Sequence, residues 1–149
     1  MAAPPSTRRI VRERAQRRCE YCRADERWQF VRFTIDHILP QAAGGSYDAD
    51  NLALAYRNCN ERRGNRVEGR DPETETVVPL FHPRRQKWAD HFVWDAARLR
   101  IIGCTPTGRA TLVMLDLNDD RHESMVVRIR QRDVADGYHP PPEDPVLSA

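Results

Sequence analysis

Lysine is almost absent from this chain, because Lys87 is the only lysine among 24 basic residues. A GC-rich genome explains such a bias towards arginine, which also suits phosphate contacts through its two parallel N–H donors. The formal net charge of +2 excludes a chain that is electropositive over its whole surface. Any affinity for a polyanion must therefore come from local arginine clusters. Aromatic residues are also scarce, at 7%, which predicts a small core.

Long apolar runs are missing as well. No segment approaches the roughly 18 apolar residues that a membrane span needs, and residues 1–6 lack the apolar core of a signal peptide. We therefore expect a cytoplasmic protein without a membrane partner. In that compartment, the four cysteines favour metal ligands or free thiols over disulfides.

The first half of the chain reads as a helix followed by two strands and a second helix. A helix is expected over Arg8–Arg18, and a strand rich in bulky apolar residues over Trp28–Ile38. A loop containing two consecutive glycines leads to a short strand at Leu52–Ala55. Asn60 then lies in a short helix that ends at Gly64. The order strand, loop, strand, helix is predicted from pattern alone.

The second half is expected to form an extension. Apolar residues at helical spacing predict a helix over Pro83–Leu99. The runs Arg100–Cys104 and Arg109–Leu117 read as a β-hairpin, and Asp119–Val134 as a final helix. The proline-rich segment Asp136–Ala149 is expected to be a loose tail.

Residues that can bind a metal or transfer a proton are concentrated between residues 33 and 64. Asp36 and His37 are adjacent at the end of the first strand, Asn51 follows the glycine loop, and Asn60 lies in the helix. Phosphodiester hydrolysis needs an activated water and neutralisation of the charge that develops on phosphate. One divalent ion and one histidine can supply both. Taken singly, each of these residues is more typical of a structural role, so the argument depends on their conjunction.

That conjunction resembles the HNH nuclease family in its variant with asparagine at the third motif position. The matching pattern is C-x-x-C, I-D-H-I-x-P, a Gly-Gly loop, N-L and C-N-x-x-R-G. The resemblance covers about residues 14–66, and reaches about residue 115 with an extension found on some small bacterial HNH proteins. It implies an α+β fold with a ββα-metal core. We expect a disordered N-terminal segment at residues 1–7, a nuclease core at 8–70, an extension packed on the core at 71–135 and a flexible tail at 136–149.

The resemblance also implies an activity and its residues. The protein is expected to be a metal-dependent endonuclease that cuts DNA and leaves 3′-hydroxyl and 5′-phosphate ends. Asp36 and Asn60 match the ligands of the catalytic ion, and oxygen ligands suit Mg²⁺ or Mn²⁺. His37 matches the general base, and Asn51 the residue that orients the histidine ring.

A second metal site is less complete in the sequence. In many members of the family, a structural zinc held by two C-x-x-C pairs stabilises the fold. Cys19 and Cys22 form the first pair here, but only Cys59 remains of the second, because Tyr56 stands at its first position. Three outcomes stay open. Cys104, His82 or His91 completes the site, or water does, or the fold holds without zinc, with the cysteines as a buried thiol cluster.

Arginines around the second helix are the expected contacts to phosphate. They are Arg57, Arg62, Arg63 and Arg66, and a further basic cluster opens the next predicted helix at residues 84–87. Two rival functions remain. One is a zinc-stabilised module that binds nucleic acid without cutting it. The other is an interaction protein that docks a partner through the C-terminal extension. The sequence does not fix the oligomeric state.

Overall fold

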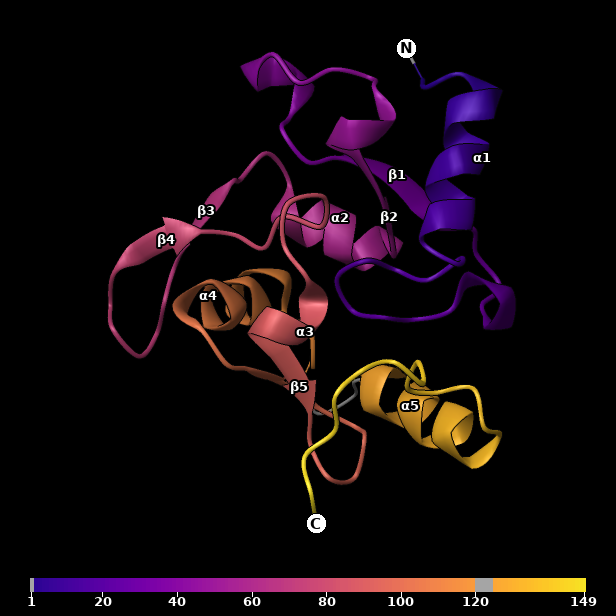
Figure 1. Cartoon of the computed structure of the whole chain (residues 1–149), viewed down its shortest axis with the longest axis vertical. Coiled ribbons are helices and arrows are strands. Elements are labelled where there is room, and N and C mark those ends of the chain that lie inside the picture. The colour runs from indigo at the N-terminus through magenta and orange to yellow at the C-terminus, as the bar shows by residue number, and fades with distance from the viewer. Residues whose placement is uncertain (1, 120–124) are drawn as a thin grey trace.

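A strand–strand–helix unit forms the centre of the molecule (Figure 1). The computed structural model describes residues 2–119 and 125–149. β1 (Thr34–His37) pairs antiparallel with β2 (Leu52–Ala55), and α2 (Arg57–Arg63) follows almost directly. The predicted order of these three elements is confirmed, and the mixed α+β class with it.

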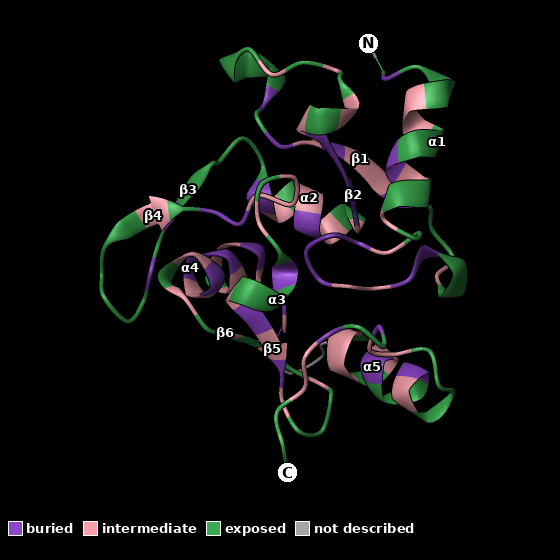
Figure 2. Ribbon diagram, in the orientation of Figure 1, coloured by how far each residue is buried: buried purple, intermediate pink, exposed green. Residues whose placement is uncertain are grey.

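β2 is the most buried element of the unit. All four of its residues are fully buried, and the burial colouring of Figure 2 shows β2 inside the fold. α1 (Pro5–Arg14) packs against β2, while α2 packs against β1. Arg12 and Arg14 of α1 donate to the carbonyls of Phe33 and Leu52 at 3.0 and 2.8 Å. These bonds fix the hairpin against the N-terminal helix.

Two boundaries in this half differ from the predictions. α1 begins at Pro5 rather than Arg8, because proline suits the first helical turn, and it ends at Arg14, before the positive φ angles of Gln16 and Arg17. β1 is also shorter than the predicted strand at residues 28–38. A 3-10 turn occupies Glu26–Trp28 instead.

Two further hairpins and a single helical turn follow the central unit. β3 (Glu68–Arg70) pairs with β4 (Val77–Pro79), and β5 (Phe92–Trp94) pairs with β6 (Ile101–Gly103). The predicted helix at residues 83–99 is wrong apart from α3 (Trp88–His91).

The reason lies in the side chains that follow α3. Phe92 and Trp94 are both fully buried, and a spacing of two residues puts them on one face of a strand. The apolar residues whose helical spacing predicted the longer helix belong to different elements, because some lie in α3 and others in β5 or the turn that follows it. Spacing alone did not distinguish the two.

The predicted strand at residues 109–117 is also wrong, because α4 (Pro106–Leu115) occupies that segment. Thr105 is the N-cap, and its hydroxyl accepts from the Gly108 amide at 3.0 Å, while Pro106 starts the helix. The Thr-Pro pair that looked like a hairpin turn is thus a helix start. The hairpin of the extension exists, but β5 and β6 form it.

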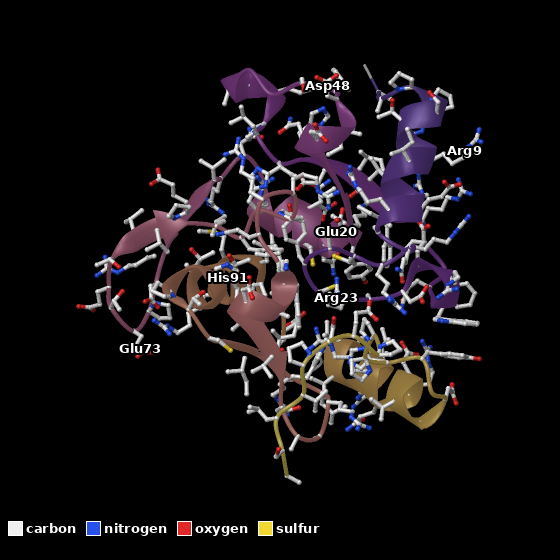
Figure 3. All side chains as sticks on the ribbon, viewed as in Figure 1. Arg9, Glu20, Arg23, Asp48, Glu73 and His91 are labelled. Carbon is white, nitrogen blue, oxygen red and sulfur yellow. The ribbon has the colours of Figure 1, made fainter. Side chains whose placement is uncertain are left out.

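α5 (Met125–Ala135) overlaps the predicted final helix at residues 119–134 and ends one residue beyond it, while residues 120–124 of that prediction fall outside the described residues. The segment 136–149 is packed rather than loose. Its Asp144 is buried, accepts from Trp94 Nε1 at 3.1 Å and pairs with Arg23. Figure 3 shows Arg23 between the central unit and α5. The proline-rich composition did not reveal these contacts.

Candidate active site and metal centre

β1 and α2 face each other through two polar pairs. Thr34 and Asp36 lie two residues apart in β1 and share a face, while Asn60 and Arg63 lie three apart and share a face of α2. Asn60 Nδ2 donates to Thr34 Oγ1 at 3.0 Å, and Arg63 Nη1 pairs with Asp36 Oδ2 at 3.0 Å. The predicted ligands Asp36 and Asn60 therefore lie on facing surfaces of neighbouring elements.

Asp36 is almost completely enclosed, with 3% of its surface exposed. Its Oδ2 accepts from Tyr21 Oη at 2.8 Å, and Arg63 Nη1 contacts both carboxylate oxygens. Burial raises the pKa of the Asp36 carboxyl above its ordinary value, and the charge of Arg63 opposes that rise. Asp36 thus forms a buried ion pair with Arg63, which was not predicted from the sequence.

Arg63 is the buried centre of this arrangement. Besides Asp36, its guanidinium donates to the carbonyls of His37 and Ile38, the residues at the end of β1. Its Nε is buried and has no hydrogen-bond partner among the described residues. Arg63 was expected to contact nucleic acid, yet its side chain binds protein atoms and is only 3% exposed.

His37 is the last residue of β1, directly after Asp36, and its side chain is half-buried. Its Nε2 lies 3.4 Å from the side-chain nitrogen of Gln41. The ring of Tyr47 meets the imidazole edge-on at 4.8 Å between centroids, and Gln41 also hydrogen-bonds the Tyr47 hydroxyl. Gln41 and Tyr47 therefore hold the ring of His37. Neither was singled out from the sequence, although Gln41 follows His37 by only four residues.

Asn51 organises the loop between the two strands. Its Oδ1 accepts from the Leu39 amide at 2.9 Å, and its Nδ2 donates to the carbonyls of Leu39 and Ser46. Gly45 packs so tightly against Leu39 that a side chain there would collide with the Leu39 carbonyl. Asn51 thereby fixes the backbone that follows His37, and its side-chain bonds reach the loop rather than the imidazole.

Two cysteines from the segment before β1 and one from α2 converge. Cys19, Cys22 and Cys59 are buried as free thiols, with their sulfur atoms within 4.8 Å of one another. Burial raises the pKa of Cys19 to about 12, whereas hydrogen bonds with Cys19 and Cys59 hold the pKa of Cys22 well below its ordinary value. Tetrahedral zinc–thiolate bonds of about 2.3 Å require sulfurs about 3.8 Å apart, so the cluster fits zinc.

None of the other candidate ligands joins this cluster in the described part of the chain. Cys104 is exposed, His91 Nδ1 contacts the hydroxyl of Thr105 at 2.6 Å, and His82 Nδ1 accepts from the Arg84 amide. The three cysteines predicted as zinc ligands therefore come together, and the candidates for the fourth ligand lie elsewhere.

The other arginines predicted to contact phosphate differ in their solvent exposure and in their ion pairs. Arg57 is exposed and pairs with Glu61 on the same helix. Arg66 is exposed and donates to the Arg62 carbonyl. Arg62 is partly covered and pairs with Asp119 at 3.1 Å. Arg57 and Arg66 are thus the two of the four whose guanidinium groups are most open to solvent.

A broad groove runs beside the loop that Asn51 holds. Its lining brings Arg14 and Arg63 together with Arg84 and Arg85 from the extension. Arg84 pairs with Glu20, which also accepts from the Leu54 amide at 2.8 Å, so this wall is tied to β2. Figure 3 shows Glu20 near the centre of the molecule. Burial lowers the pKa of Arg84 to about 10, which leaves it charged at neutral pH.

The comparison with family models gives one match, described as HNH endonuclease, over residues 19–66. The matched segment is about a third of the chain, and it begins at Cys19 and ends at Arg66. It contains the cysteine cluster and every residue predicted for the catalytic site. Neither the curated proteins nor the solved structures give a match. No helix in the described ranges has the length and apolar character to cross a membrane.

Proposed function

Because residues 19–66 are a domain of the HNH endonuclease family, we propose that this protein is a metal-dependent endonuclease that hydrolyses phosphodiester bonds in DNA. The observation that carries the proposal is the β1–β2–α2 unit. It presents Asp36 and His37 at the end of one strand and Asn60 on the helix that packs against it. The family implies a nucleic-acid substrate, and DNA is our specific choice.

Asp36 and Asn60 are the proposed ligands of the catalytic ion. A carboxylate and an amide offer the oxygen donors that Mg²⁺ and Mn²⁺ prefer. Asn60 uses its Nδ2 to bind Thr34, so its oxygen is the atom left to serve as a ligand. When bound, the ion supplies Lewis-acid neutralisation of the charge that develops on the phosphate and the leaving oxygen. Arg63 holds Asp36 in the described conformation and must yield part of that contact.

His37 is the proposed general base. It takes the proton of the attacking water, a role that suits imidazole because its ordinary pKa lies near neutrality. Gln41 and Tyr47 restrict the ring, and Asn51 fixes the backbone beyond it. Asn51 is therefore proposed to position His37 through the loop. Family resemblance implies that the products carry a 3′-hydroxyl and a 5′-phosphate.

The groove and its neighbouring arginines are proposed to bind the DNA backbone. Arg57 and Arg66 lie exposed on and just after α2, and Arg84 and Arg85 line the groove on its far wall. Contacts of this kind are independent of sequence and weaken as salt rises. We do not propose a defined target sequence. Arg62 is included as a contact that must first leave Asp119.

Zinc at Cys19, Cys22 and Cys59 is proposed to hold the domain together. The three residues come from the segment before β1 and from α2, so one ion would join both ends of the unit. Structural zinc of this kind contributes directly to folding free energy. The buried thiols fit this role better than a catalytic one.

One observation favours a second candidate, a zinc-stabilised module that binds nucleic acid without cutting it. Asp36 already has a full cationic partner in Arg63, and a family fold can persist after its chemistry is lost. The two candidates share the groove and the zinc, and they differ only in whether a divalent ion reaches Asp36.

Supercoiled-plasmid cleavage separates the candidates. The purified protein is incubated with plasmid in Mg²⁺, in Mn²⁺ or in EDTA, and binding to the same DNA is followed by gel shift. The nuclease is expected to convert the plasmid to nicked or linear forms only with the metals. DNA binding without cleavage under any metal would select the binding module instead.

A further inference from the structure

The cysteine cluster supplies three ligands where a structural zinc site normally has four. The spacing of Tyr56 and Cys59 repeats that of Cys19 and Cys22, so Tyr56 stands where a fourth cysteine belongs. Tyr56 is the residue immediately before α2, and it lines the same cavity as Cys22 and Cys59. The fourth ligand of this metal must therefore differ from the cysteine that is usual at this position.

The phenol of Tyr56 is a poor candidate for that position. By ordinary bond lengths, a tyrosine oxygen lies about 6.5 Å from its Cα and a cysteine sulfur about 2.8 Å. A tyrosine at a cysteine position thus carries its hydroxyl past the metal. The ring also packs edge-on against Phe33, with centroids 5.5 Å apart. Phenolate is not among the usual zinc ligands.

Two other candidate ligands among the described residues already have partners. His139 lines the same cavity, but its Nε2 contacts the Arg98 carbonyl at 3.0 Å and its ring packs on Trp94. Cys104 is exposed, and its thiol donates to the Ile102 carbonyl. Across residues 2–119 and 125–149, no fourth Cys, His, Asp or Glu brings a ligand atom within 4.8 Å of all three sulfurs.

The cavity itself offers an alternative. It lies between the cysteine cluster and α5, and its volume is about 50 Å³. One water needs roughly 10–15 Å³ of such space, so the cavity holds a few waters or a small anion. Arg62 and Arg130 contribute guanidinium groups to its wall. Arg130 is buried and donates to the Leu117 carbonyl at 2.7 Å, which holds its charge beside the thiols.

We propose that the metal at Cys19, Cys22 and Cys59 keeps its fourth coordination position open to this cavity, where water or a small monoanion binds exchangeably. The inference rests on the zinc site of the proposed function and is independent of catalysis at His37. It distinguishes this centre from a closed structural site, because three thiolates with an exchangeable ligand leave the metal accessible. Asp25, Asp116 and Asp133 line the same cavity as the arginines, so the charge of the wall does not select an anion over water.

Cobalt substitution tests this arrangement directly. Co²⁺ is loaded into the full-length protein in place of zinc, and its absorption spectrum is recorded during an azide titration. The wild-type spectrum is expected to show three thiolates and to shift as azide binds. In Tyr56→Cys, the thiolate-to-cobalt charge-transfer intensity is expected to rise by about a third, from three sulfurs to four, and azide is expected to have no effect.

Tyr56→Phe is the matched control, since it removes only the hydroxyl. Its spectrum and its azide response are expected to equal those of the wild type. A changed spectrum in Tyr56→Phe would make the phenol a ligand and overturn the proposal. A wild-type spectrum that ignores azide would do the same. If neither Co²⁺ nor Zn²⁺ binds at all, the zinc site fails as well, whereas the plasmid assay judges the nuclease separately.

Discussion

Replacing His37 with alanine is expected to lower the rate of DNA cleavage by about 10²- to 10⁴-fold, the usual contribution of a positioned general base. The imidazole is partly exposed at the end of β1, and its neighbours Gln41 and Tyr47 are polar residues of a surface loop. Its loss should therefore leave the fold and DNA binding intact. Cleavage of supercoiled plasmid in Mg²⁺, with gel shift on the same DNA, measures both.

His91→Ala is the matched control, because it makes the same change at a partly buried histidine outside residues 19–66. It is expected to cleave plasmid at close to the wild-type rate. Equal cleavage by wild type and His37→Ala would contradict the assignment of the base, or would reveal a contaminating nuclease. A His37→Ala variant that has also lost DNA binding would point to a structural role.

Replacing Arg63 with alanine is expected to destabilise the protein by about 3–5 kcal/mol, measured by denaturant unfolding in zinc-containing buffer without Mg²⁺ or Mn²⁺. The change leaves Asp36 buried with Tyr21 as its remaining hydrogen-bond partner among the described residues, and it removes the donors to the carbonyls of His37 and Ile38. Breaking one side of a buried ion pair carries a cost of this size.

Arg57→Ala supplies the comparison on the same helix. Its ion pair with Glu61 is exposed on both sides, so its loss is expected to cost about 0.5 kcal/mol or less. Adding Mn²⁺ should recover part of the stability of Arg63→Ala, because a divalent ion at Asp36 replaces the missing charge. An Arg63→Ala variant as stable as Arg57→Ala would show that the buried pair does not hold the site together.

The sequence was enough to predict the central unit. Leu52–Ala55 is an apolar run bounded by Asn51 and Tyr56, and the strand that ends at Asp36-His37 is stopped by Pro40. Local pattern and family resemblance agreed there, and the elements follow one another closely along the chain. The convergence of Cys19 and Cys22 with Cys59 was likewise expected, because the resemblance to the HNH family implies a zinc held by two C-x-x-C pairs, of which Cys59 is the last position.

The partners of the site residues were harder to predict. Five arginines lie between residues 57 and 70, and composition does not say which of them turns inwards. A signal did exist, because Asn60 and Arg63 are three residues apart and so share the helix face that meets β1. Tyr21 was hidden for another reason. It lies inside the C-x-x-C segment, and nothing in the local sequence indicates that its hydroxyl donates to Asp36.

The prediction for the extension was wrong because two local patterns compete there. Residues 109–115 are rich in apolar and β-branched side chains, which favours a strand, but Thr105 and Pro106 form a helix start that outweighs it. The packing of residues 136–149 depends on Arg23 and Trp94, far away in the sequence. No local pattern encodes such contacts.

The most direct test of the account is the dependence of cleavage on Mn²⁺ concentration in wild type, Asn60→Ala and His37→Ala. Loss of a metal ligand is expected to move the Mn²⁺ midpoint of Asn60→Ala to higher concentration. His37→Ala should keep the wild-type midpoint and lose maximal rate instead. That split would support a divalent ion on Asp36 and Asn60 beside a separate base at His37. An Asn60→Ala midpoint equal to that of the wild type would contradict it.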